Sequence, residues 1–238
     1  SSGGIVMKTV NAGTSGVSGA LSFTSGTTSR GASGSITLAT GTATNGKGGN
    51  IVLSVSPGTE SIDPTDTGGD VIVRAGDSTA ASGTGSGGAI SLTTGLGTAR
   101  SSGDFVVQTS NAGSSGVSGK LSFTSGTSSV GNSGLISMVT GAATNGKSGA
   151  LLASVGSGTT GTGGSVSIIA GETTAASAVG GGVYIVAGLA SSSNAAEGGA
   201  VSVTGGIGAS ITGGALSLST GEGTASSSGG IVMKTVNA

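Results

Sequence analysis

Residues 19–26 read "GALSFTSG", and the pattern of these eight positions returns along the whole chain. Each copy has Gly at position 1, apolar residues at positions 3 and 5, a small residue at position 7 and usually Gly at position 8. A short run that alternates apolar and polar residues between glycines is typical of a half-buried β-strand. Fifteen copies begin at Gly3, Gly19, Gly34, Gly49, Gly69, Gly88, Gly103, Gly119, Gly134, Gly149, Gly164, Gly181, Gly199, Gly214 and Gly229.

A single strand with two aliphatic side chains cannot bury them alone, so successive copies must stack on one another. We therefore predict an all-β fold, a parallel β-solenoid of about fifteen repeats of 15–20 residues, uncapped at both ends. Whether one or two repeats form a coil stays open, and an antiparallel meander is the alternative arrangement. The side chains expected to point inward are Leu21, Phe23, Ile36, Leu38, Ile90, Leu92, Phe105, Val107, Leu121, Phe123, Val166, Ile168, Val201, Val203, Leu216 and Leu218.

Two longer periods lie above the short one. Residues 2–58 resemble residues 102–158 at an offset of 100, and both segments contain the motif "ATNGK". Residues 1–12 and 227–238 are identical, which gives a second offset of 226. From these periods we expect residues 1–238 to form one continuous segment of a longer tandem-repeat chain.

The composition excludes several classes of protein. The chain contains 53 glycines and only 2% aromatic residues, too few large side chains for an ordinary globular core. Its mean hydropathy of +0.33 and net charge of −1 also differ from those of disordered chains, which are polar and highly charged. The near-neutral balance gives no electrostatic footprint for nucleic acid, and no apolar run is long enough to span a membrane.

The sequence contains no His and no Cys, which excludes Ser-His-Asp and Cys-His catalysis and the common zinc sites. We expect the protein not to be an enzyme, with no catalytic residue and no cofactor-binding residue.

One region has an unusual charge. Five of the nine acidic residues, Glu60, Asp63, Asp66, Asp70 and Asp77, are gathered in one stretch. Calcium sites need several carboxylate and carbonyl oxygens at once, so these residues are the candidates for a calcium site. The alternative is a solvated surface loop in which Arg74 balances part of the charge, and the primary expectation is that no metal is bound.

Outward hydroxyl pairs, such as Ser22 with Thr24 and Ser91 with Thr93, suggest a second class of function. Flat β-solenoids with ranks of threonine recognise ice, although Ala39, Val139 and Lys8 interrupt the rank here. A binding module, either an adhesin or an ice-binding β-solenoid, is therefore the alternative function. The many hydroxyl groups also supply acceptors for O-linked glycans.

The motif "SGGxhxhxTG", where h is apolar, with spacers rich in Ser, Thr and Ala, resembles the long Gly/Ser-repeat proteins of microalgal and protist cell surfaces, including mastigoneme-like filament components. This resemblance covers the whole chain and transfers no site residue. It implies an extracellular or cell-surface protein that self-associates into a fibre or continues within the same chain. We therefore expect a structural repeat segment of an extracellular filament or surface fibre, which propagates by end-to-end continuation of the β-solenoid.

Overall fold

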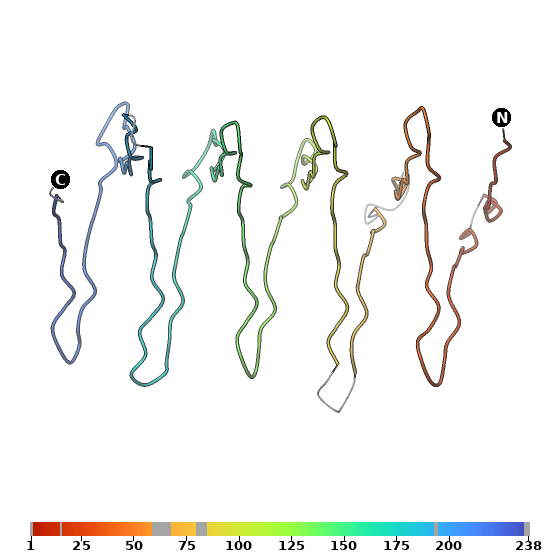
Figure 1. The fold of residues 1–238 in the computed structure, drawn as a ribbon, viewed down its shortest axis with the longest axis horizontal. Helices are drawn as coiled ribbons and strands as arrows, with labels where there is room; N and C mark the ends of the chain where they lie inside the picture. Colours follow the sequence, from red (N-terminus) through yellow and green to blue (C-terminus); the bar gives the residue numbers. More distant parts are fainter. Residues whose placement is uncertain (1, 15, 59–67, 80–84, 193–194, 236–238) are drawn as a thin grey trace. The chain divides into compact units, whose positions relative to one another are not determined.

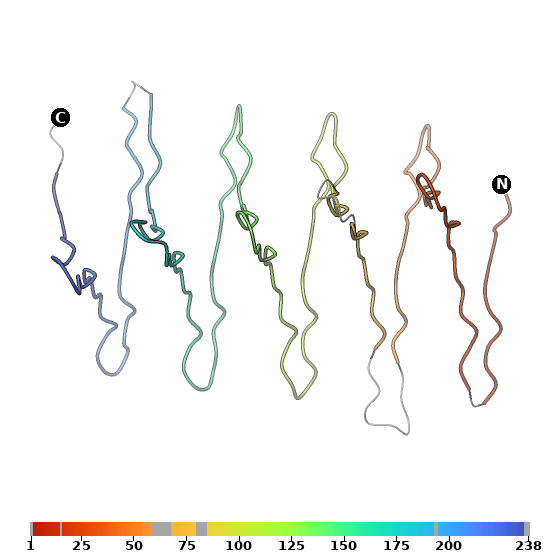
Figure 2. The same ribbon diagram turned by 90° about the horizontal axis from the view of Figure 1, so that it is seen from below.

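A computed structural model describes residues 2–14, 16–58, 68–79, 85–192 and 195–235 of the chain. No residue in these ranges belongs to a helix or a strand. Extended segments alternate with turns and loops, as Figures 1 and 2 show. The backbone of the described residues therefore repeats an extended segment and a turn in each copy, but it forms no regular secondary structure.

The chain divides into two units, Ser1–Leu121 and Ser122–Ala238. The division falls inside the copy that begins at Gly119, between its positions 3 and 4. Each unit contains seven of the links that join one copy to the next, so both units are built from the same repeated elements.

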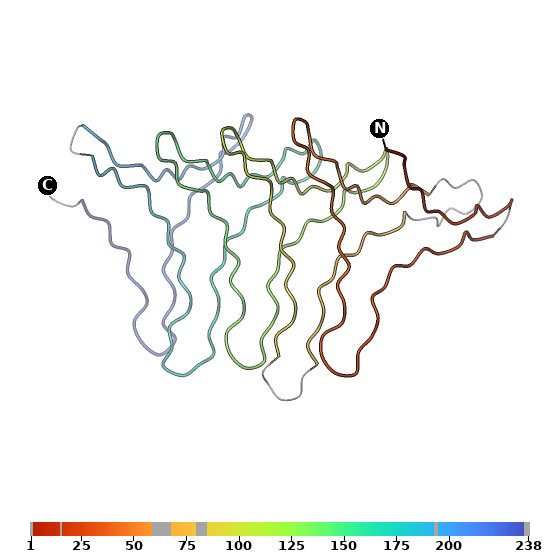
Figure 3. The same ribbon diagram turned by 45° about the vertical axis from the view of Figure 1, so that its right-hand side comes forward.

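The predicted all-β fold and parallel β-solenoid are wrong for the described residues, because no strand occurs among them. The alternation of apolar residues specifies which side chains share a side of the backbone, but a strand also needs a neighbour that pairs with it along its length. Here the backbone hydrogen bonds between neighbouring copies occur at single points, at the glycines, and the extended segments drawn in Figure 3 are not paired in rows among the described residues.

The predicted continuous apolar core is also wrong, since no described residue is buried. Leu21, for example, has 57% of its surface exposed and Leu216 has 56%. The alternation nevertheless persists as a difference between neighbours: Val183 at position 3 is 52% exposed, whereas the adjacent Tyr184 is 89% exposed. The extra residues between copies, such as 172–180, are exposed as expected, but so is most of the chain.

Seven backbone–backbone hydrogen bonds occur in the described residues, and six of them share one arrangement. In each, the N–H of a position-1 glycine donates to the carbonyl of the glycine at position 8 of the preceding copy. The bond closes the loop between the two copies at its base. The six pairs, donor first, are Gly88 with Gly76, Gly103 with Gly95, Gly181 with Gly171, Gly199 with Gly188, Gly214 with Gly206, and Gly229 with Gly221.

Every closed nine-residue loop has Gly at its third residue, but this glycine alone does not close a loop, because the loop 156–164 has Gly158 there and lacks the bond. Loops 95–103, 206–214 and 221–229 have Gly at their third residue, and all three are closed by the hydrogen bond. A Cβ on Gly223 would lie 2.5 Å from the carbonyl oxygen of Ser227, so only glycine allows the backbone to turn this tightly. Four loops of the same length have Thr, Ser or Ala there and lack the bond: 26–34, 41–49, 126–134 and 141–149.

The offset of 100 residues is reproduced in the turns. Thr28 Oγ1 donates to the carbonyl of Arg30 at 2.7 Å, and Ser128 Oγ donates to the carbonyl of Val130 at 3.0 Å. The next residues, Gly31 and Gly131, have φ of 95° and 102°. A side chain is strained at such angles, so the glycine is required where the loop reverses.

We predict that the closing hydrogen bond slows amide exchange in the closed loops. Gly103 and Gly119 both follow serine, so their intrinsic exchange rates match, but only the N–H of Gly103 is hydrogen-bonded. A hydrogen bond with a net worth of about 0.5–1.5 kcal/mol makes exchange about 2 to 10 times slower. Hydrogen exchange followed by NMR measures this ratio, and equal rates would contradict the closure.

The role of the third glycine is tested by two substitutions in the loop 221–229. Gly223→Ala should bring the exchange of the Gly229 amide to the rate of Gly134, which also follows serine and has no hydrogen bond. Gly221→Ala is the control, because it keeps the accepting carbonyl and adds its Cβ in open space. Protection at Gly229 that survives Gly223→Ala would show that the third residue is not the cause.

Candidate functional site

Successive copies meet at a recurring contact, which we call the junction: the glycine at position 1 of one copy against the residue at position 7 of the copy before it. In thirteen of the fourteen links, a Cβ on the glycine would lie within 4 Å of that residue. The residues at position 7 are Thr9, Ser25, Thr40, Val55, Ala75, Thr94, Thr109, Ser125, Thr140, Val155, Ala170, Ala187, Gly205 and Thr220.

The fourteenth link is an even closer contact of the same kind. Here position 7 is Gly205, and a Cβ on it would overlap the carbonyl oxygen of Gly214, the position-1 glycine that follows. Backbone therefore meets backbone directly, which explains why this one copy has glycine at position 7.

The junctions are the best-covered part of the molecule. Ten described residues are half-buried, and six of them are at position 7: Thr9, Ala75, Thr94, Ala170, Ala187 and Gly205. Two more, Gly97 and Gly223, are the third residues of closed loops. The closest packing therefore involves small side chains and glycine, whereas the large aliphatic residues remain exposed.

An apolar hollow of about 500 Å³ lies in the unit Ser122–Ala238, between two consecutive copies. Phe123 at position 5 of one copy lines it together with Ile136, Ser137 and Met138, which occupy positions 3, 4 and 5 of the next. Three of its four lining residues are therefore the apolar residues of the repeat, and Ile136 is 50% exposed.

The structure covers only part of the calcium candidates. Glu60, Asp63 and Asp66 lie outside the described residues, whereas Asp70 and Asp77 are described and exposed. The guanidinium of Arg74 forms an ion pair and a hydrogen bond with the carboxylate of Asp77, as the solvated-loop alternative expects. No group of three or more metal-ligating side chains forms within the described ranges, so calcium binding stays a prediction.

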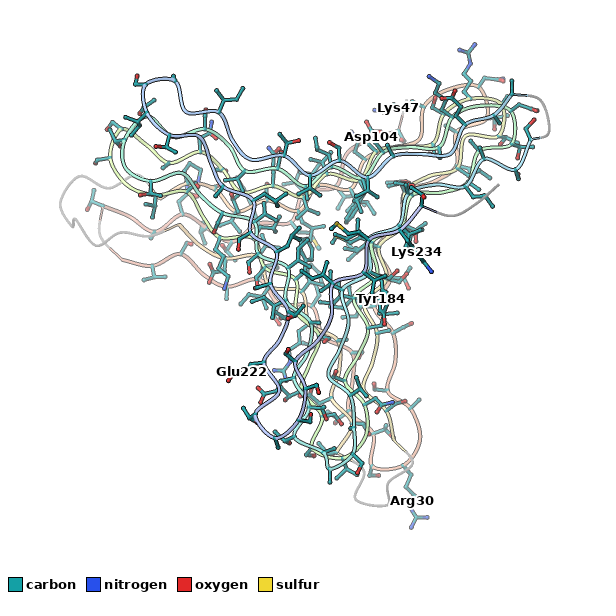
Figure 4. All side chains as sticks on the ribbon, turned by 90° about the vertical axis from the view of Figure 1, so that its left-hand side faces the viewer. Arg30, Lys47, Asp104, Tyr184, Glu222 and Lys234 are labelled. Atoms are coloured by element: carbon teal, nitrogen blue, oxygen red, sulfur yellow. The ribbon has the colours of Figure 1, made fainter. Side chains whose placement is uncertain are left out.

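Charged side chains do not gather into a site elsewhere in the described residues. Arg30 and Lys234 project away from the backbone in Figure 4. The hydroxyl pairs proposed for ice recognition, such as Ser22 with Thr24, lie on extended segments that belong to no strand. A flat hydroxyl-bearing sheet is therefore missing from the described part of the chain.

The repeat pattern predicts the central packing at positions 3 and 5, whereas the closest contacts lie at position 7. The signal was present in the pattern, because position 7 accepts only Thr, Ser, Ala, Val or Gly in all the links. Such a restriction indicates close approach of another segment, and the obligatory glycine at position 1 of the next copy indicates where that segment is.

No protein-family model matches the chain, and no significant match was found among curated proteins or solved structures. Among the described residues, no helix has the length and apolar character that crossing a membrane requires.

We predict that a methyl group at position 1 opens a junction. In Gly164→Ala the new Cβ would lie 2.8 Å from Cγ1 of Val155, a stiff β-branched side chain that cannot easily move away. NOEs between residue 164 and the Val155 methyl groups should weaken or vanish. Gly163→Ala is the adjacent control, since its Cβ meets nothing within 4 Å and the NOEs should persist. Equal effects of the two substitutions would contradict the junction.

Proposed function

We propose that this chain is a structural, non-enzymatic repeat segment of an extracellular filament or surface fibre, in which the exposed apolar side chains pack against further copies of the same repeat. The observation that carries the proposal is the exposure of the apolar residues at positions 3 and 5 throughout the described copies.

The solvent-accessible area shows how much surface association could bury. A folded globular protein of this mass exposes about 9,000 Å², whereas this chain of 21.4 kDa exposes 23322 Å². Apolar surface in water costs about 25 cal/mol per Å², so its burial strongly favours association. The apolar hollow at Phe123 and Ile136 is one place where a side chain of another copy would be covered on several sides.

Little opposes the approach of two copies. Eight basic and nine acidic residues give a net charge of −1 over 238 residues, so electrostatic repulsion between copies is weak. The extended segments also have backbone N–H and C=O groups outside the seven hydrogen bonds of the described part, and such groups favour pairing with another chain.

Two features support the structural role and the extracellular location. The absence of His and Cys removes the most common nucleophile and base pairs of enzymes. The rhythm and composition of the repeat resemble those of algal and protist surface proteins, which is the basis for placing the fibre outside the cell.

The proposal is tested by following the purified chain over a range of concentrations. We expect sedimentation to show a critical concentration for assembly and electron microscopy to show fibres of uniform width above it. A chain that stays monomeric at high concentration, or that gives only irregular aggregates, would contradict the proposal. An ice-recrystallisation or glycan-binding assay on the monomer tests the binding-module alternative.

Substitution of two adjacent aliphatic residues tests whether assembly depends on packing at the apolar hollow or only on the total exposed apolar surface. Ile136 at position 3 lines the apolar hollow, whereas Leu135 at position 2 is 89% exposed and is not part of its lining. Burial of such a side chain is worth about 1.5–3 kcal/mol, so Ile136→Ser should raise the critical concentration about tenfold or more. Leu135→Ser should have a much smaller effect, and equal shifts would show that the hollow has no special role.

A further inference from the structure

The motif "ATNGK" occurs at 43–47 and again at 143–147, and nothing in the junctions or the apolar positions explains it. It contains Asn45 with Gly46 and Asn145 with Gly146, the two positions in the chain where asparagine precedes glycine. We propose that Asn45 and Asn145 are sites of spontaneous deamidation, in which the backbone nitrogen of the following glycine attacks the side-chain amide.

The chemistry needs only the chain and water. The Gly46 nitrogen loses its proton and bonds to Cγ of Asn45, the bond from Cγ to Nδ2 breaks, and ammonia leaves with the proton. The resulting five-membered succinimide adds one water molecule and opens at either of its two carbonyl carbons. The products are aspartate and isoaspartate, and the net reaction consumes one water and releases one ammonia.

Access to the glycine nitrogen controls this reaction, and the structure leaves it open at both sites. Glycine has no Cβ to shield its nitrogen. A Cβ on Gly46 or Gly146 would meet no atom within 4 Å, so the surroundings are empty as well. The backbone bends at 44–46 and at 144–146, and all these residues are exposed.

No hydrogen bond in the described structure restrains the reacting groups. The amide N–H groups of Gly46 and Gly146 and the side chains of Asn45 and Asn145 form none. The two loops, 41–49 and 141–149, have Ala43 and Ala143 at their third residue and belong to the loops without a closing hydrogen bond. Both sites are therefore free to reach the geometry of attack.

The other described asparagines provide internal controls. Asn11 and Asn111 precede alanine, Asn50 precedes isoleucine and Asn132 precedes serine, and all four are exposed like Asn45 and Asn145. Exposure is thus the same, and the residue that follows the asparagine is the difference. Each conversion adds one negative charge, so the two together change the formal net charge from −1 to −3.

The test is incubation of the full chain in neutral buffer, followed by trypsin digestion and mass spectrometry. Trypsin cleaves after Lys and Arg, so residues 31–47 report Asn45 alone, residues 121–147 contain both Asn132 and Asn145, and residues 101–120 report Asn111. Fragmentation of the second peptide compares site and control in the same molecule. We expect Asn45 and Asn145 to convert on the order of tenfold faster than Asn111 and Asn132, because only they precede a residue without a Cβ.

Three further results decide the proposal. Isoaspartate must appear together with aspartate, since direct hydrolysis would give aspartate alone. Gly46→Ala and Gly146→Ala should slow conversion at their own site to the rate of the controls and leave the other site unchanged. Rates in native buffer and in denaturant should agree, because the structure leaves both sites unrestrained. Equal conversion of all asparagines, absence of isoaspartate, or protection of Asn45 and Asn145 in native buffer would each overturn the proposal.

Discussion

The close approach between a glycine at position 1 and a small residue at position 7 is the contact on which the described structure depends. It recurs at fourteen links although the loops between the copies differ in length and sequence. Absence of a Cβ on one partner and a compact side chain on the other allow the two segments to come this close. A chain with 53 glycines can therefore define the points where it meets itself without having a core of large side chains.

Position 7 and the third residue of the loop affect two different contacts, the junction and the closing hydrogen bond. The junction brings the two ends of a loop together, and glycine at the third residue allows the backbones of a nine-residue loop to come close enough for a hydrogen bond, although the loop 156–164 with Gly158 stays open. Gly97 and Gly223 allow the tighter arrangement, whereas Ala43 and Ala143 do not. Loop length alone does not determine the outcome, because closed and open loops can both have nine residues.

The sequence predicted the register of the repeat but not its secondary structure. The glycines chosen as starts of the copies are the glycines at the junctions, and the offset of 100 residues reappears in the turns at Gly31 and Gly131. The solenoid was wrong because alternation at positions 3 and 5 fixes the side of a segment and contains no information about a partner. For the calcium candidates, Asp77 pairs with Arg74, a local ion pair that the nearby cation already suggested.

Two apolar residues per copy, none of them buried in the described residues, also constrain what the chain can become. Because each link is held by small residues, the large aliphatic side chains at positions 3 and 5 contribute little to the described contacts and remain in water. Their cost then grows with the number of repeats, whereas weak charge adds almost nothing to oppose association. Burial against other copies removes that cost at every repeat at once, so lengthening the array strengthens assembly more than it stabilises the isolated chain.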